Sequence, residues 1–439
     1  MARKVFLSIL GTGPYSECTY SVEKQDIMST RYIQLATIKH LIQKGIANNE
    51  EWTKDDAVII FVTQKSEEQQ WLKGLSRENG STVEREGLKA LAEKEGFPMP
   101  VVPVRIKDGN NEEEIWEVFN VIFDKIEEDD ELYLDTTHAF RYLPMLLLVL
   151  IDYAKFLKNV KVKSVTYGNF MVEDSSKPIM DLTPILRLQD WTFAAGQYIE
   201  NGSVDRLVSL CEQEFKPILK ESKGSNEVAQ NLRVFSQKLL AVTEERQTCR
   251  GLDIIKSTSF KGLKQSADKL ESTFIDAFNP IFEKIKSSLV SFDENENIRN
   301  GLSAANWCYK NGLYQQSATI LQEFVVSFLC LRHGIAIDDE VNREIINKAF
   351  NIKYHNTRKE GWIIEPEKVD KLEEVLLDDL FEDKNLINNF NNLTEVRNDF
   401  NHSGMRLKRP PLKPQNIKEN IRKCILEFAL ILFNIKAEL

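Results

Sequence analysis

An arginine and a histidine stand five positions apart in the segment NNLTEVRNDFNHSG, residues 391–404. Placed on one α-helix at about 100° per residue, Arg397, Asn398 and His402 fall on one polar arc. The opposite side of this helix is apolar and consists of Leu393, Val396 and Phe400. We therefore expect one face to join the core of a helical domain and the other to carry polar side chains. Gly404, just beyond, is expected to end the helix.

These side chains suit cleavage of RNA without a metal ion. The ribose 2′-hydroxyl is the nucleophile, His402 can move a proton, and Arg397 can stabilise the charge of the developing phosphorane. The products would be a 2′,3′-cyclic phosphate and a 5′-hydroxyl. Asn398, one helical turn before His402, can orient the imidazole. The alternative is a solvent-facing arginine and histidine with no catalytic role, because the bare spacing often arises by chance.

A second group of reactive side chains lies in ELYLDTTHAFRYLPMLLLVLIDYAKFL, residues 131–157. A short apolar run ends at Asp135, and a helix-like segment follows. The polar side chains between them are those of Thr136, Thr137, His138 and Arg141. The two threonines can cap the helix or donate hydrogen bonds to phosphate oxygens. The helix N-terminus near Ala139 adds the positive end of its dipole.

The elements that must position these residues change in character along the chain. Up to about residue 187, short apolar runs alternate with helix-like segments. The apolar runs cover residues 4–11, 56–63, 99–106, 131–135 and 160–168. The helix-like segments cover residues 31–45, 112–126 and the residues after His138. Strands rich in Val and Ile between periodic helices predict a mostly parallel sheet flanked by helices, in a Rossmann-like, doubly wound α/β domain.

Ligands of such sheets bind beyond the carboxyl ends of the strands. Four polar loops follow predicted strands and are expected to face one crevice there: residues 11–17, 63–68, 135–141 and 167–170. The candidate ligand-binding residues are Gly11, Thr12, Gly13, Gln64, Lys65, Asp135, Thr136, Thr137, His138, Arg141, Gly168 and Asn169. Glycines let backbone amides approach a phosphate, and the polar side chains add donors. The crevice is therefore expected to hold an anionic, nucleotide-like ligand.

The usual cofactor signatures are absent from the sequence. Neither G-x-G-x-x-G nor G-x-x-x-x-G-K-[ST] occurs, so neither a dinucleotide cofactor nor ordinary ATP hydrolysis is supported. The 6 cysteines lie far apart with no C-x-x-C pair, so neither a zinc site nor a disulfide framework is indicated. We predict no cofactor and no metal site.

From about residue 188 onward strand-like runs vanish, and this half is predicted to be nearly all helix. Long amphipathic segments cover residues 204–221, 225–247, 262–288, 301–333, 367–400 and 415–438.

Composition bounds the class of protein. A chain of 439 residues with 42% hydrophobic and 28% charged residues is expected to form two or three globular domains. The most apolar segment, residues 143–151, is too short to cross a bilayer, and no signal peptide is evident, which favours the cytoplasm and no membrane partner. A net charge of -10 argues against a protein that coats nucleic acid non-specifically.

The motif LDTTHAFR, together with LSILGTG near the start, resembles the CRISPR-associated accessory proteins with a CARF sensor domain. One subfamily of these proteins carries the signature Asp-x-Thr-His-Gly-Phe-Arg, and Ala139 stands here where the glycine is common. The resemblance implies that the crevice binds a cyclic oligoadenylate across the two-fold axis of a homodimer. The subfamily favours the tetra-adenylate, and the hexa-adenylate stays open.

The segment around Arg397 resembles the HEPN ribonucleases. In that family an arginine, the next polar residue and a histidine carry catalysis, which here implies Arg397, Asn398 and His402. Residues 306–329 also resemble a helical stretch beside the HEPN core of these CARF proteins. The two resemblances imply a CARF sensor domain, a helical connecting region and a HEPN ribonuclease domain, at residues 1–187, 188–300 and 301–439 respectively.

The combined expectation is an endoribonuclease of type III CRISPR antiviral defence. A cyclic oligoadenylate would activate metal-independent cleavage of single-stranded RNA at a site that two chains share, in a dimer or a higher oligomer of dimers. An alternative is a non-catalytic sensor whose helical half binds nucleic acid or protein. A further possibility is that the crevice cuts its own ligand, because Thr136, Thr137 and His138 are chemically able to position a ribose.

Overall fold

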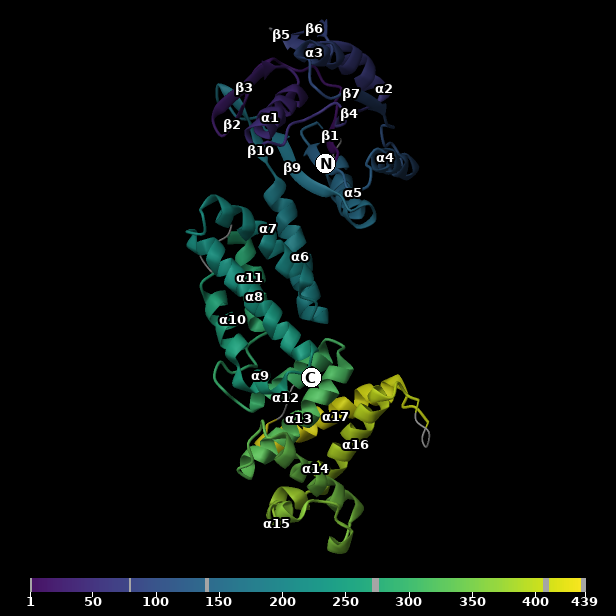
Figure 1. Ribbon diagram of the computed structural model, residues 1–439. Helices are drawn as coiled ribbons and strands as arrows, with labels where there is room; N and C mark the ends of the chain where they lie inside the picture. The colour runs from purple at the N-terminus through teal and green to yellow at the C-terminus, as the bar shows by residue number, and fades with distance from the viewer. Residues whose placement is uncertain (1, 79, 139–141, 271–275, 406–409, 436–439) are drawn as a thin grey trace. The chain divides into compact units, whose positions relative to one another are not determined.

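The computed structural model describes residues 2–78, 80–138, 142–270, 276–405 and 410–435 (Figure 1). The chain divides into two compact units, Met1–Arg187 and Leu188–Leu439. Each unit is described by itself below.

In the described part of the first unit, eight strands form one mixed sheet in the order β3-β2-β10-β9-β8-β1-β4-β7. Their bounds are β1 Lys4–Ile9, β2 Cys18–Val22, β3 Gln25–Thr30, β4 Ala57–Val62, β7 Val101–Arg105, β8 Glu131–Asp135, β9 Lys161–Gly168 and β10 Ser176–Asp181. The five strands from β9 to β7 are parallel to one another, whereas β10 pairs with β9 in the antiparallel direction. The predicted Rossmann-like, mostly parallel sheet is confirmed, with β10, β2 and β3 as an added edge that the sequence did not predict.

Strand β1 lies at the point where the order of the sheet reverses. The chain builds outward from β1 to β4 and β7, and then returns to place β8 on the other side of β1. Leu7 of β1 accordingly lies opposite Ile59 of β4 and Leu134 of β8. Ligands of open α/β sheets bind at the carboxyl ends of the strands next to such a reversal. Here those ends are Ile9 and Asp135.

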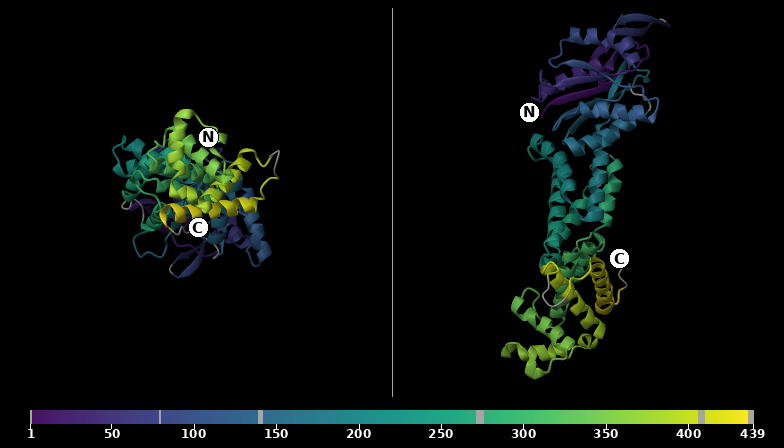
Figure 2. Two further views of the ribbon diagram at one scale, coloured as in Figure 1. Left: turned by 90° about the horizontal axis from the view of Figure 1, so that it is seen from below. Right: turned by 90° about the vertical axis from the view of Figure 1, so that its right-hand side faces the viewer.

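Helices cover both faces of the sheet (Figures 1 and 2). On one face, α4 (Glu112–Asp124) and α5 (Leu143–Lys158) pack on alternate residues of β1, β4 and β8. On the other face, α1 (Ile33–Ala47) and α3 (Leu88–Glu95) pack on the intervening residues. Alternation of buried side chains to both faces is the reason that these strands are apolar almost throughout.

The start of α5 differs from the prediction. The described helix begins at Leu143, and its N-cap Tyr142 makes no side-chain capping bond. Thr136 and Thr137 therefore do not cap α5 at its described start, and Ala139, near which the helix N-terminus was expected, lies outside the described residues. The threonines do not cap the helix because both of their hydroxyl groups form hydrogen bonds with the neighbouring strands, as shown below.

A short insertion follows β4 and was not predicted. It consists of α2 (Gln64–Ser66), the π-helix η1 (Glu67–Leu72) and the antiparallel hairpin β5 (Lys73–Glu78) and β6 (Ser81–Glu86).

The second unit is helical throughout its described part. Its helices are α6 Thr183–Asn201, which begins before the boundary, α7 Asp205–Glu221, α8 Glu227–Gln247, α9 Gly251–Lys256, α10 Thr258–Asp268, α11 Asn279–Ser287, α12 Arg299–Lys310, α13 Tyr314–Arg332, α14 Glu340–His355, α15 Val369–Leu376, α16 Lys384–Asn401 and α17 Pro414–Phe433. The predicted all-helical half is confirmed. One hydrophobic core runs from Trp191 to Phe428, on both sides of the boundary predicted at residue 300.

Helix α13 is central to the part of the unit that carries the Arg/His motif. It packs against α12, α14, α16 and α17, and most of its side chains from Ser317 to Cys330 are buried.

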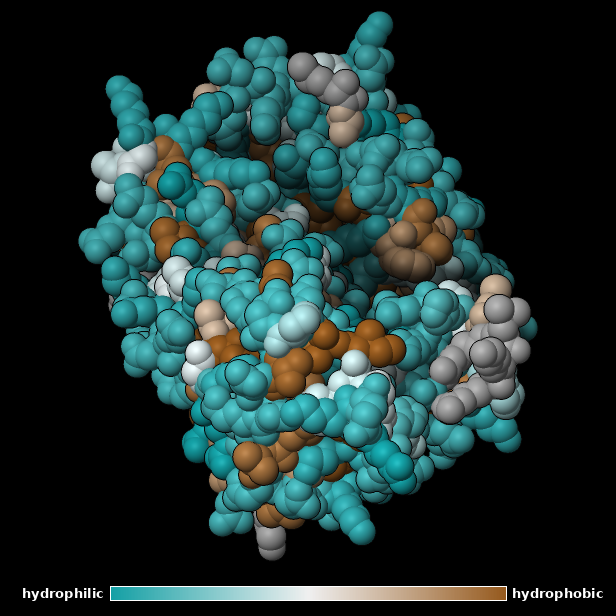
Figure 3. Space-filling view, turned by 60° about the horizontal axis from the view of Figure 1, so that its bottom comes forward, coloured by the Kyte–Doolittle hydropathy of each residue, from teal (hydrophilic) through white to brown (hydrophobic). Residues whose placement is uncertain are grey.

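The surface shown in Figure 3 is mostly hydrophilic, with hydrophobic side chains in separate patches. Among the described residues, no helix has the length and apolar character that a membrane crossing needs.

Candidate functional site

The carboxylate of Asp135 organises the sheet edge at the end of β8. It is buried, and it accepts a hydrogen bond from Ser8 Oγ of β1 at 2.7 Å. It also accepts bonds from the main-chain N and the Oγ1 of Thr137, at 3.1 and 2.5 Å. Because buried carboxylates are stable only when their oxygens are paired, Asp135 fixes the loop after β8 to the neighbouring strand β1.

The two threonines connect this loop to β9. Thr136 donates to the main-chain O of Thr166 through both its N and its Oγ1, at 2.9 and 3.0 Å. Thr137 Oγ1 accepts from the main-chain N of Gly168 at 2.7 Å. A Cβ at Gly168 would overlap Cδ1 of Ile33, so a larger residue here would have to displace the end of that side chain. These hydrogen bonds join the loop after β8 to the end of β9.

His138 brings the glycine loop after β1 to the same place. Its ring lies 4.6 Å from that of Tyr15, and a Cβ at Gly11 would lie 3.7 Å from His138 Cβ. Burial lowers the pKa of His138, although the charge of Asp135 opposes this effect. The imidazole is therefore expected to be neutral at neutral pH, able to offer one donor and one acceptor.

Several buried polar atoms at this edge have no hydrogen-bond partner among the described residues. Besides Oη of Tyr15, they include Nε2 of His138 and Oε1 of Gln34. Gln34 is held in place because its Nε2 donates to Ser8 Oγ and to the main-chain O of Ile9, at 3.2 and 3.3 Å. Leaving such atoms unpaired is costly, so those of His138 and Gln34 are suited to bind a polar ligand or water.

Gln70 of η1 also holds the glycine loop, and no sequence motif pointed to this residue. Its Nε2 donates to the main-chain O of Gly13 at 2.5 Å and of Leu75 at 3.2 Å. Its Oε1 accepts from Tyr32 Oη at 2.9 Å, and Tyr15 N bonds to the main-chain O of Leu75 at 3.0 Å. The inserted hairpin therefore shapes the loop that follows β1.

The remaining candidate residues of the first unit lie less centrally. Gln64 and Lys65 are exposed on α2, and Gln64 bonds to Glu68 at 3.2 Å. Thr12 is half-buried in the glycine loop. Asn169 bonds to its own β9–β10 connection, because its Oδ1 accepts from the N of Met171 at 3.1 Å. Arg141 lies outside the described residues.

In the second unit, α16 places the Arg/His motif as the helical geometry predicts. Leu393 and Val396 are buried, whereas Arg397 and Asn398 are half-buried and His402 is exposed. The helix ends at Asn401, and His402 is its C-cap residue.

Gly404 ends the helix as predicted. Its φ is 73°, and its main-chain N donates a hydrogen bond to the main-chain O of Asp399 at 2.9 Å.

The guanidinium of Arg397 is held by two adjacent residues of α13. Its Nη1 donates to Gln322 Oε1 at 3.2 Å and to Glu323 Oε1 at 3.3 Å. Gln322 in turn donates its Nε2 to Thr394 Oγ1 at 3.1 Å. The structure thus brings Arg397 and His402 to one end of α16 and orients the arginine from a second helix. Sequence reasoning missed Gln322 and Glu323, a polar pair within the otherwise apolar run ILQEFVVSFL.

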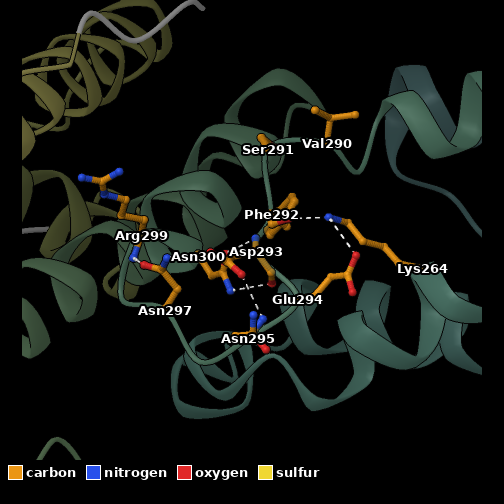
Figure 4. Close-up of a pocket in the computed structure, with 10 residues that line it drawn as sticks. All are labelled: Lys264, Val290, Ser291, Phe292, Asp293, Glu294, Asn295, Asn297, Arg299 and Asn300. Carbon is orange, nitrogen blue, oxygen red and sulfur yellow. Dashed lines mark hydrogen bonds and ion pairs between the residues drawn. The ribbon is translucent and has the colours of Figure 1, made fainter.

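A separate polar cavity of about 520 Å³ lies beside the loop between α11 and α12 (Figure 4). Several of the residues that line it bond to one another, mostly from a side chain to the main chain. Lys264 Nζ donates to the main-chain O of Phe292 at 2.8 Å, and Asn300 Oδ1 accepts from the N of Asp293 at 2.8 Å. These bonds account for the conformation of the loop, and we assign the cavity no ligand.

Comparison with known proteins bears on the first unit. Residues 5–170 match the family described as CRISPR system endoribonuclease Csx1, CARF domain. The first unit matches a CARF domain. The CARF resemblance is thereby confirmed for these residues, while the HEPN assignment of the second unit stays a prediction.

Two further similarities extend beyond that unit. The CRISPR-associated protein MJ1674 of Methanocaldococcus jannaschii is 27% identical in an alignment of 263 residues that covers 57% of this chain and 38% of that protein. This chain therefore spans well under half of that relative. The structure of Enterococcus italicus Csm6 bound to cyclic hexa-2′-fluoro-hexa-dAMP aligns with 99% of this chain and 94% of its own, at 11% identity and a TM-score of 0.40.

Proposed function

We propose that this protein is an endoribonuclease of CRISPR antiviral defence that a cyclic oligoadenylate activates. The ligand binds at the carboxyl edge of the first unit, and the second unit cleaves single-stranded RNA. The match of residues 5–170 to the CARF domain of a CRISPR system endoribonuclease supports the sensing half. Nε2 of His138 and Oε1 of Gln34 are buried at this edge without a partner among the described residues, and they suit the polar atoms of a nucleotide.

One observation carries the catalytic half of the proposal. An exposed imidazole, His402, stands five residues after an arginine, Arg397, whose guanidinium is held by Gln322 and Glu323. Such a pair supplies a proton carrier and a fixed cation, which are the two groups that cleavage by a ribose 2′-hydroxyl needs.

In this mechanism the RNA supplies its own nucleophile. The 2′-oxygen forms a bond to phosphorus as the bond from phosphorus to the 5′-oxygen breaks, which leaves a 2′,3′-cyclic phosphate and a 5′-hydroxyl. His402 takes the proton of the 2′-hydroxyl, a proton is returned to the 5′-oxygen, and Arg397 stabilises the added negative charge. Asn398, in the turn before His402, orients the imidazole.

We further propose that the active form is a homodimer. A ring of identical adenylates is matched by a two-fold pocket built from two copies of the same loops. The tetra-adenylate is the preferred activator because of the subfamily that the LDTTHAFR motif resembles, and the hexa-adenylate is the alternative. Activation then requires the ligand to bind the active arrangement more tightly than the resting one.

The test is RNA cleavage in EDTA with and without each cyclic oligoadenylate. We expect one ring size to activate cleavage, and His402→Ala to lower the rate by at least about 100-fold while ligand binding is retained. The matched control is His355→Ala, since His355 is also exposed and ends helix α14 of the same unit. Cleavage that needs a divalent metal, that ignores every ring, or that survives His402→Ala would contradict the proposal.

A further inference from the structure

The carboxylate of Glu323 joins two arginines that come from different helices. Its Oε1 accepts from Arg397 Nη1 at 3.3 Å, and its Oε2 accepts from Arg343 Nη2 at 2.8 Å. Glu323 lies on α13, Arg343 on α14 and Arg397 on α16. One carboxylate therefore ties three helices together at the guanidinium of the Arg/His motif.

Arg343 is the most firmly held of these three charged side chains. Its side chain is only 15% exposed, and its Nη1 donates to Ser327 Oγ at 2.8 Å and to the O of Ile337 at 2.9 Å. Its Nη2 also reaches the main-chain O of Glu323 at 3.4 Å. A planar guanidinium with acceptors on both terminal nitrogens has one orientation, so the bonded carboxylate of Glu323 is fixed as well.

Arg397 is the least restrained of the three side chains. Its side chain is 32% exposed, and its contacts to Gln322 and Glu323 lie at the long end of the hydrogen-bond range. A long side chain in this setting would sample several rotamers without its partners on α13. Gln322 and Glu323 therefore restrict the directions in which the guanidinium can point.

The charges also match a role in binding phosphate. The negative charge of Glu323 is offset by Arg343, so the three side chains together keep one net positive charge at Arg397. Without Arg343, a lone carboxylate beside Arg397 would neutralise the cation that the phosphate needs. The pair of Arg343 and Glu323 thus orients Arg397 and leaves its charge available.

We propose that Glu323, held by Arg343, is a positioning residue that aims the guanidinium of Arg397 at the scissile phosphate. The inference rests on the proposed ribonuclease function and adds a residue that the Arg/His motif does not contain. A displacement of about 1 Å in a group that stabilises a transition state can cost up to about 100-fold in rate.

The first experiment measures kcat and KM for RNA with the full-length variant Glu323→Gln at saturating activator. Glutamine keeps the size of the side chain but cannot accept from both arginines. We expect kcat to fall about tenfold while KM stays within about threefold, because positioning acts mainly in the transition state. The matched control is Glu344→Gln, which removes an exposed carboxylate next to Arg343 that pairs with Lys348 at 3.4 Å. This control should retain the wild-type rate.

The second experiment separates positioning from a general loss of structure. Glu323→Gln is combined with Arg397→Lys, which keeps the cation but not the planar fork. If Glu323 acts through Arg397, its substitution lowers the rate of the Arg397→Lys protein by less than about twofold. Equal losses in both backgrounds, or wild-type kcat in Glu323→Gln, would overturn the inference alone. A wild-type protein that cleaves no RNA with any activator would overturn the proposed function and this inference together.

Discussion

Two charged residues show how differently one side-chain type can be used in the two units. Asp135 is buried at a strand end, where three hydrogen bonds hold it, and it serves the architecture of the sheet edge. Glu323 lies half-exposed between two arginines and faces a site of proposed chemistry. The first carboxylate is a fixed support for its loop, and the second controls the orientation of a cation.

The buried imidazole of His138 predicts a sensitivity of the first unit to acid. Burial holds its folded-state pKa below the ordinary value of 6.5, so below that pH the unfolded chain binds a proton that the folded chain does not. The free energy of unfolding therefore falls as the pH drops through this range. Burial lowers the pKa of His40 on α1 as well, which acts in the same direction.

Denaturant unfolding of wild type and His138→Asn at pH 7.5 and 5.5 checks this prediction. One pH unit below 6.5 can remove at most about 1.4 kcal/mol per histidine, and the variant should lose less than wild type by up to that amount. His40→Asn serves as a comparison, because the less buried imidazole of His40 is expected to contribute less to the pH-dependent loss in the free energy of unfolding. A pH-dependent loss of equal size in wild type and His138→Asn would contradict the prediction.

The residues of the two sites were predictable to different degrees. Asp135, Thr136, Thr137 and His138 form a contiguous polar break after an apolar strand, which the sequence displays directly. Ser8 and Gln34 are single polar residues within apolar runs, and their role depends on which elements become neighbours in the fold. Glu323 lies 74 positions from Arg397, so no local pattern reveals that the two side chains meet.

At the scale of elements, the end of α16 decides where His402 lies. His402 is the C-cap residue, and Ser403 and Gly404 follow it with φ of 51° and 73°. Met405 N bonds to the O of His402 at 2.8 Å, which closes the turn around the histidine. The conformation of Gly404 is therefore directly coupled to the backbone of the proposed catalytic residue.

We predict that Gly404→Ala lowers RNA cleavage by more than its effect on stability explains. A Cβ at this φ costs about 1 kcal/mol and shifts the turn that carries His402. The matched control is Gly334→Ala, because Gly334 has φ 68° and follows the C-cap of α13 in the same unit. Both variants should show similar losses in thermal unfolding, and only Gly404→Ala should lower kcat by about tenfold or more. Equal kcat values for the two variants would contradict the prediction.

The strands themselves were predictable where Val, Ile and other residues that favour strands recur. Strands β1, β4, β7 and β8 consist mainly of apolar residues, whereas β9 alternates valines with polar residues, and the structure confirms all five. The hairpin β5–β6 escaped prediction because its sequences KGLSRE and STVERE carry charges on largely solvent-facing strands. The predicted helix 301–333 is in fact α12 and α13, which separate at Gly312, where φ is 75°.

At the scale of the whole molecule, α5 has apolar side chains on all sides. Leu147, Leu150 and Ile151 pack into the core of the first unit. About 180° away on the helix, Met145, Val149 and Phe156 are exposed, and Phe156 is 85% exposed. A helix that is hydrophobic all round is normally buried, and an exposed apolar stripe of this length marks an interaction surface.

We predict that this stripe contacts the second copy of the chain in the proposed homodimer. The double variant Val149→Ser with Phe156→Ser should raise the dimer dissociation constant by about tenfold or more, since large apolar side chains dominate such contacts. Sedimentation velocity over a range of protein concentrations measures this change. Leu377→Ser is the control, because Leu377 is as exposed as Phe156 but lies in the second unit.

The same variant connects dimerisation to function. If the activator binds across the two-fold axis, weaker dimers need a higher protein concentration for half-maximal RNA cleavage, by the same factor as the dissociation constant. The ligand-saturated activity at high protein concentration should return to the wild-type level, because the Arg/His motif itself is unchanged. A double variant that dimerises like wild type would show that another partner covers the stripe. A variant that loses its dimer yet keeps full activity at every concentration would refute a site shared between two chains.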